Sequence, residues 1–122
     1  MKGFQYVADW KPQDEKVGTR KGFVNVPMLE AREAGSKLSL RFRGTAVGIF
    51  CVAGPRAGVL EYSVDGGKYR SLDMLTQWSE NLYLPWVYML GTELKRGEHV
   101  LKIRLAKGAR TECQIRNFVV ND

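Results

Sequence analysis

Histidine and cysteine are scarce in this 122-residue chain, which has one histidine and two cysteines. Cys51 and Cys113 form no CxxC pair, and His99 has no second ligand-type residue at a useful spacing. Structural zinc sites need four such ligands, so we predict neither a metal site nor a cofactor. Each cysteine lies in an apolar run, where a buried free thiol is the usual state. Pairing of the two in an exported protein stays open.

The motifs of common hydrolases are also missing. The chain contains no GxSxG or Gly-Asp-Ser string and no glycine-rich phosphate loop before a helix. A Ser-His-Asp triad would depend on His99, which starts a predicted strand and is interpreted as structural. A Cys–His pair is formally possible, but no spacing supports it. The acids Glu61 and Asp65 are explained by a strand face and a turn. The sequence therefore predicts that this chain is not itself an enzyme.

Long apolar runs are absent as well. No stretch of eighteen apolar residues occurs, so we predict no membrane-spanning helix and no membrane partner. Asp9 and Trp10 lie where a signal peptide would have its apolar region. A cytoplasmic protein, an exported protein without its leader and a fragment of a longer protein all stay open.

Positive charge exceeds negative charge, with 19 lysines and arginines against 13 acids and a formal net charge of +6. This balance permits attraction to nucleic acid or to anionic glycans. The basic residues are scattered, and pairs such as Arg41 with Arg43 and Lys102 with Arg104 have the alternate spacing of a solvated sheet face. A basic composition alone is weak evidence for nucleic-acid binding, so we predict no nucleic-acid partner.

Alternation of apolar and polar residues with a period of two dominates the chain, and this pattern indicates half-buried strands. Residues 45–53 are apolar on both faces and are expected to form a central strand. Asp65-Gly66-Gly67 is a strong hairpin signal, because these residues tolerate positive φ. The strands are predicted at 22–28, 37–43, 45–53, 59–64, 68–74, 84–90, 99–105 and 112–120.

About eight short strands with glycine-rich turns are typical of an all-β sandwich or barrel, and we predict an antiparallel sandwich. We expect one domain over residues 22–122, preceded by an irregular arm at 1–21 that wraps the sandwich. Residues 22–28 are expected at a sheet edge, and Pro85 near the start of its strand. The one helical candidate is Met74–Asn81.

The segment 77–88 is unusually rich in aromatic and amide side chains. It contains Gln77, Trp78, Asn81, Tyr83, Trp86 and Tyr88. Flat aromatic faces stack against the C–H edges of pyranose rings, and amides reach the hydroxyls, so this segment is a candidate sugar site. The alternative is that Trp78 and Trp86 fill the core. Trp86 and Tyr88 share one strand face, and such an aromatic surface needs either a lid or a ligand.

The loop Gly54–Gly58 is a second candidate, because it places Arg56 between two glycines after the most apolar strand. An arginine there could bind a carboxylate of a ligand. A plain exposed turn is the alternative.

Several strings along the chain form a recognisable set: Gly44–Phe50, Ala53–Pro55, Ala57–Gly58, Glu61–Gly67, residues 76–79 and 82–86, Gly97–His99 and Arg116–Asn121. Together they resemble the β-sandwich domain attached to many bacterial SGNH/GDSL-type hydrolases. Similar jelly-roll domains accompany carbohydrate esterases that deacetylate plant polysaccharides, so the resemblance implies a sandwich of jelly-roll or galactose-binding-like architecture. The likeness runs from about Gly22 to Asn121, and the strings TQWS and LPW are its most specific parts.

In that family the Ser-His-Asp machinery lies in a separate α/β domain, which this chain lacks. The resemblance therefore implies an accessory module, excised or standalone, and transfers no catalytic residue to this chain. It implies a carbohydrate or the module's own SGNH catalytic domain as the partner, and a periplasmic or secreted location if the parent hydrolase is exported. Two functions stay open: binding or positioning of a polysaccharide, and purely structural packing on the catalytic domain through residues 77–88.

Overall fold

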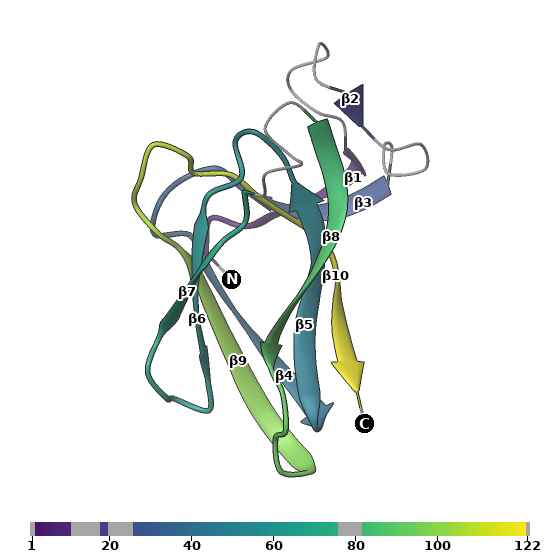
Figure 1. The fold of residues 1–122 in the computed structure, drawn as a ribbon, viewed down its shortest axis with the longest axis vertical. Coiled ribbons are helices and arrows are strands. Elements are labelled where there is room, and N and C mark those ends of the chain that lie inside the picture. The colour runs from purple at the N-terminus through teal and green to yellow at the C-terminus, as the bar shows by residue number, and fades with distance from the viewer. Residues whose placement is uncertain (1, 11–17, 20–25, 76–81, 122) are drawn as a thin grey trace.

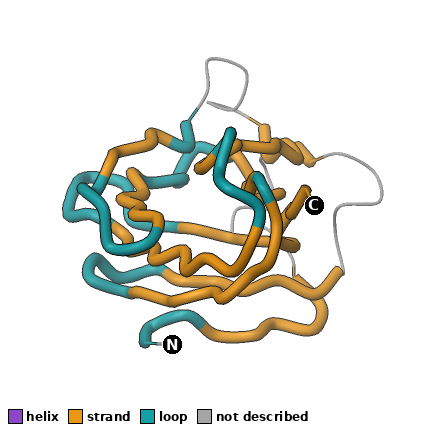
Figure 2. The backbone as a smooth tube through the Cα atoms, turned by 90° about the horizontal axis from the view of Figure 1, so that it is seen from below, coloured by secondary structure: helices purple, strands orange, loops and turns teal. Residues whose placement is uncertain are grey.

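A computed structural model describes residues 2–10, 18–19, 26–75 and 82–121, and shows two β-sheets packed face to face (Figure 1). The described residues form strands and loops without a helix (Figure 2). None of this described structure is therefore a helix that could cross a membrane. The strands are β1 (Gln5–Trp10), β2 (Gly18–Thr19), β3 (Val26–Ala31), β4 (Lys37–Gly44), β5 (Ala46–Ala53), β6 (Val59–Val64), β7 (Arg70–Asp73), β8 (Leu82–Gly91), β9 (Gly97–Leu105) and β10 (Cys113–Asn121).

The strand order confirms the predicted jelly-roll sandwich. One sheet has the order β1-β3-β10-β5-β8-β2 and the other β4-β9-β6-β7. From β3 to β10 the chain alternates between the sheets, except at the β6–β7 hairpin. The pairs β3·β10, β4·β9, β5·β8 and β6·β7 are nested and antiparallel, which is the winding of a jelly roll. Among the described strands, the two-residue β2 is the one that pairs in parallel, with the start of β8.

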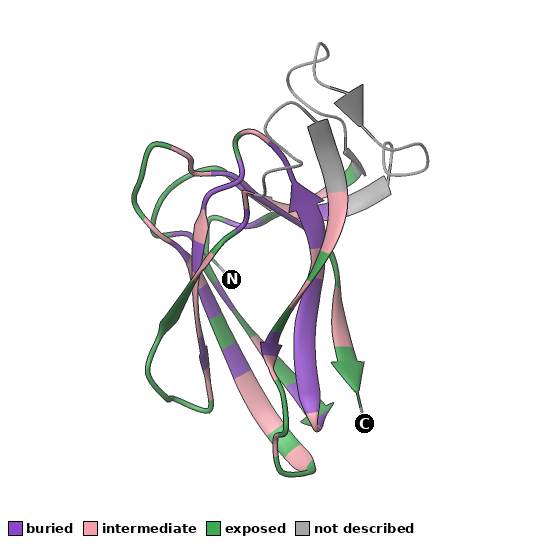
Figure 3. Ribbon diagram, in the orientation of Figure 1, coloured by how far each residue is buried: buried purple, intermediate pink, exposed green. Residues whose placement is uncertain are grey.

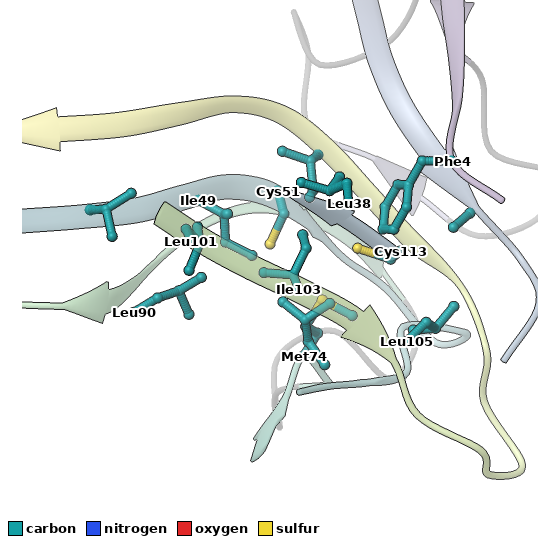
Figure 4. Packing of buried hydrophobic residues seen from close by; sticks show 14 of the residues in the cluster. Phe4, Leu38, Ile49, Cys51, Met74, Leu90, Leu101, Ile103, Leu105 and Cys113 are labelled. Carbon is teal, nitrogen blue, oxygen red and sulfur yellow. The ribbon is translucent and has the colours of Figure 1, made fainter. Parts of the chain in front are cut away.

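The core lies between the sheets, where the inward side chains of both layers meet. On β9 the predicted alternation is confirmed: Leu101, Ile103 and Leu105 are buried, and Lys102 is exposed. Figure 3 shows this banding along β9 and the nearly continuous burial of β5. Strand β5 has neighbours on both sides, as expected for a central strand. Figure 4 shows the cluster, which includes both cysteines.

The N-terminal segment differs from the expected irregular arm. Strand β1 pairs with β3, with Gln5 opposite Glu30, and the side chain of Phe4 is only 4% exposed. The strand was not predicted because β1 has only six residues and a polar, turn-rich stretch follows Trp10. The buried side chain of Phe4 attaches β1 to the core. Because β1 covers one side of β3 and β10 the other, β3 is not the edge strand that the sequence predicted. Residues 22–25 of that prediction lie outside the described residues.

Two strand boundaries and the helical candidate also differ from expectation. Strand β8 begins at Leu82, before Pro85, because β2 pairs with its first two residues. Beyond Tyr83 β8 has no described neighbour on that side, so Pro85 lies where a missing N–H is tolerated. The return strand β7 is shorter than predicted. Met74 does not start a helix, because its N–H donates to the carbonyl of Gly58 at 3.0 Å and so extends the β6–β7 pairing by one residue. Residues 76–81 lie outside the described part.

Candidate functional site

The structure describes only part of the predicted sugar-binding segment. Gln77, Trp78 and Asn81 lie outside the described residues. Tyr83 belongs to β8, where its backbone pairs with Thr19, and its side chain is outside the description. Of the predicted segment, the side chains that can be placed are therefore those of Trp86 and Tyr88.

Trp86 and Tyr88 share one face of β8, as predicted, and that face points inward. Trp86 is opposite Cys51 and Tyr88 is opposite Ile49, and both partners belong to the core. Tyr88 packs against the core, and its hydroxyl donates to the carbonyl of Met74 at 3.2 Å. Burial, more than the neighbouring charges, raises the pKa of Tyr88 to about 12. The other sheet thus covers part of this aromatic face, while both rings stay half-buried.

A cleft of about 390 Å³ opens beside the lower half of β8, between that strand and the β6–β7 hairpin. Its apolar lining consists of Tyr62, Val64, Met89, Leu90 and Leu94. Its polar groups are Lys68, Arg70 and Thr92. The cleft thus combines apolar side chains with several polar groups that can fix the orientation of a small ligand. We call this cleft, together with Trp86 and Tyr88 farther along β8, the open flank.

Arg56 does not line the cleft of the open flank. Its guanidinium forms a salt bridge with Glu112 at 3.7 Å, so it binds a carboxylate of its own chain. Glu112 also accepts a hydrogen bond from the amide of Gln114 at 3.0 Å, and the same amide donates to Glu30 at 2.9 Å. Arg32 closes this network on Glu30 at 3.0 Å. This network was not predicted from the sequence, where its one signal is that the polar residues Glu112 and Gln114 interrupt an apolar run.

A second charged pair fastens the loops at this end of the sandwich. Arg110 donates two parallel hydrogen bonds to Asp73, at 2.9 and 2.8 Å, and a third to the carbonyl of Ala57 at 2.6 Å. The guanidinium lowers the pKa of the Asp73 carboxyl. Such a bidentate pair is fixed in orientation, so the loops that follow β5, β7 and β9 are held together as one unit.

His99 is placed as the sequence interpretation expected, near the start of β9. Its Nδ1 lies 2.5 Å from Oδ2 of Asp65, and its Nε2 lies 2.6 Å from the carbonyl oxygen of Lys95. Both neighbours only accept hydrogen bonds, so both ring nitrogens carry protons. The hydrogen bond to Asp65, followed by that to the carbonyl of Lys95, raises the pKa of His99. An imidazolium held in this way has no free nitrogen with which to act as a general base.

The two thiols are equally unsuited to nucleophilic chemistry. Cys51 and Cys113 are fully buried in the core and unpaired. Burial raises the pKa of Cys51 to about 12 and that of Cys113 well above its ordinary range. The thiolate is the reactive form of cysteine, and this environment suppresses it. Within the described residues, no group of three His, Cys, Asp or Glu side chains could hold a metal ion.

Solved structures with this fold belong to enzymes that act on carbohydrates. A two-domain esterase active on acetylated mannans, crystallised with mannopentaose, superposes with a TM-score of 0.69 at 18% identity, over 97% of this chain and 32% of that one. A family two carbohydrate esterase from Cellvibrio japonicus gives 0.62 at 15% identity, over 97% and 33%. An exo-β-1,3-galactanase from Phanerochaete chrysosporium gives 0.58 at 12% identity, over 96% and 26%.

The chain thus has the fold of one part of these enzymes and spans about a third of their length or less. The sequence identities are low, so the likeness concerns the fold. No protein-family model matches the sequence, and no curated protein does.

Proposed function

We propose that this chain is a non-catalytic accessory β-sandwich module of an SGNH/GDSL-type esterase, and that it binds carbohydrate or positions a polysaccharide substrate. The observation that carries the proposal is that almost the whole chain superposes on about one third of carbohydrate esterases. A module of this size leaves the chemistry to the rest of such an enzyme. The doubly protonated His99 and the buried thiols support the same division.

The sugar site proposed here is the open flank. Trp86 supplies a half-buried ring of the kind that stacks on pyranose faces. The cleft, which lies farther along β8, supplies two cations from the β6–β7 hairpin and the hydroxyl of Thr92. Trp86 and Gly91 are five residues apart, a distance of about 17 Å in a strand. A bound glycan of several residues would therefore follow β8 from Trp86 to Arg70 and Thr92.

Affinity electrophoresis in gels that contain acetylated mannan tests this site. Wild type is expected to be retarded, and Trp86→Ala and Arg70→Ala are each expected to lose most of the retardation. Tyr6→Ala is the matched control, because Tyr6 is an exposed aromatic residue on the distant strand β1. Equal retardation of all four proteins would reject the open flank as the site, and a lack of retardation on every glycan tested would reject carbohydrate binding.

A second function, structural packing on a catalytic domain, is favoured by the outer face of β8. Val87 and Met89 point away from the core and are 50% and 46% exposed. Apolar side chains of this size on one strand suit an interface between domains. Sedimentation of the chain mixed with an adjoining catalytic domain tests this function. Association that Val87→Glu abolishes would favour packing, and two independently sedimenting species would exclude it.

A further inference from the structure

The outward side chains of β4 and β9 form a surface on which cations gather, and part of it is hollowed beside Arg41 and Arg43 by a pocket of about 520 Å³. Its positively charged members are Lys37, Arg41, Arg43, Lys102 and Arg104. In the sequence they are scattered pairs, but the register of the two strands sets Lys37 opposite Arg104 and Ser39 opposite Lys102. We call this surface the basic face. It lies on the outer side of the four-stranded sheet and is separate from the open flank.

Most of the charge on the basic face is not neutralised by the chain. Glu61, on the neighbouring strand β6, binds Arg104 at 3.0 Å. Glu98 of β9 lies opposite Arg43 on the same face. Lys37, Arg41, Arg43 and Lys102 are nevertheless all exposed and form no salt bridge with any other described residue. Successive outward residues of a strand are about 7 Å apart. The face therefore presents a row of cations along β4, which Lys102 and Arg104 extend onto one half of β9.

The chemistry of this array fits a polymer that carries carboxylates at intervals. Guanidinium groups such as those of Arg41 and Arg43 bind carboxylates through two parallel hydrogen bonds. Ser39 lies between these arginines and Lys37 on the same strand and offers a hydroxyl for sugar hydroxyls. Uronate polymers present both groups along an extended chain.

Single-stranded nucleic acid fits the face less well. Proteins bind it by combining cations with aromatic rings on which bases stack. The ring beside the described part of this face, that of Tyr69, is already covered, because the guanidinium carbon of Arg104 lies 3.7 Å from its centre. The face is formed by strands and so has no helix to enter a duplex groove.

We propose that the basic face binds an acidic polysaccharide through its uronate carboxylates. This proposal goes beyond the carbohydrate site on the open flank, and each can fail without the other. The binding is electrostatic, so it is expected to weaken as added salt screens the charges.

Titration of the protein with polygalacturonate tests the proposal, at about 0.02 M and about 0.2 M NaCl. The fully methyl-esterified polymer is the matched neutral ligand. The double variant Arg41→Glu with Arg43→Glu is expected to bind at least about tenfold more weakly at low salt. Lys95→Glu with Lys107→Glu makes the same change in net charge at exposed loop positions and is expected to bind like wild type. An unchanged melting temperature shows that each variant is folded.

Three outcomes would overturn the proposal. The first is no binding of polygalacturonate at low salt, and the second is equal weakening in both double variants, which would indicate a general effect of net charge. The third is tighter binding of a single-stranded DNA oligonucleotide that depends on Arg41 and Arg43, because it would assign the face to nucleic acid. The methyl-esterified polymer separates the two sites. If it binds, and if only Trp86→Ala abolishes that binding, the neutral polymer is bound by the open flank and not by the basic face.

Discussion

Asp65 joins the β6–β7 turn to strand β9 through the ring of His99. One carboxylate oxygen of Asp65 lies 2.5 Å from Nδ1 of His99, and the other accepts a hydrogen bond from the N–H of Val100 at 2.8 Å. Asp65 has a φ of 53° and Gly66 a φ of 75°, as the hairpin signal in the sequence predicted. The conformation of the turn therefore places the Asp65 carboxylate against β9. There it holds His99, which has a structural role as a cation.

The pH dependence of stability should report this pair. The pKa of His99 is raised in the folded chain, so its stabilisation is full below about pH 6.5 and is lost as the pH rises through the folded pKa. The pKa of Asp65 is lowered. The stabilisation that the Asp65 carboxylate contributes is therefore present above about pH 4 and is lost as the pH falls through its folded pKa. We expect the difference in melting temperature between wild type and His99→Gln to shrink from about pH 6 to about pH 9. A pH-independent difference would show that His99 is not held as a cation.

The two parallel hydrogen bonds from Arg110 to Asp73 should stabilise the loops through their geometry more than through the charge of the guanidinium. Arg110→Lys keeps the charge but cannot make two parallel bonds to Asp73 and a third to Ala57. Because the pair is partly exposed, we expect a loss of about 1 kcal/mol in the free energy of unfolding, measured with urea. Lys107→Arg, in the same loop, is the control. A loss below about 0.3 kcal/mol would mean that the fork contributes little.

The buried thiols should react only when the chain unfolds. A thiol reagent in excess is expected to label neither Cys51 nor Cys113 in the native protein at neutral pH, because both are fully buried and their pKa values are raised. Labelling should follow the unfolding transition in urea and yield two modified residues. Cys113→Ser should cost about 1–3 kcal/mol, since it buries a hydroxyl without a designed partner. Rapid labelling of the native chain would contradict the burial of these residues.

Close approach of β5 and β8 requires a glycine at position 48. A Cβ on Gly48 would lie 2.6 Å from the carbonyl oxygen of Tyr88, where β8 bulges. We expect Gly48→Ala to destabilise the chain by about 1–3 kcal/mol, because backbone atoms must move apart. Gly108→Ala is the matched control, since its Cβ would meet nothing closer than 3.9 Å. Similar unfolding curves for the two variants would contradict the close contact.

The sequence predicted the sandwich well because its signals are local. The alternation at Leu101, Ile103 and Leu105 and the turn at Asp65 arise from neighbouring residues. Strand β1 was missed because its identity depends on a long-range partner, β3, and on the burial of Phe4. The jelly-roll order likewise became visible only through pairings between distant strands, although the resemblance to known sandwich domains implied it.

The candidate site was predictable only in part. The shared face of Trp86 and Tyr88 follows from their spacing, but its inward direction depends on the register with Cys51 and Ile49. The partner of Arg56 is Glu112, which is far away in sequence. The basic face was hidden for the same reason, since only strand pairing brings Arg41 and Lys102 onto one surface.

Proton NMR of an acetylated mannan oligosaccharide with the purified chain tests the central claim, a carbohydrate-binding module without catalysis, most directly. One sample reports both halves of the claim: saturation transfer from the protein to the sugar protons measures binding, and the free acetate signal measures hydrolysis. We predict saturation transfer that Trp86→Ala abolishes, with no growth of free acetate. Growth of free acetate that His99→Ala stops, or a lack of saturation transfer to every glycan tested, would contradict the account.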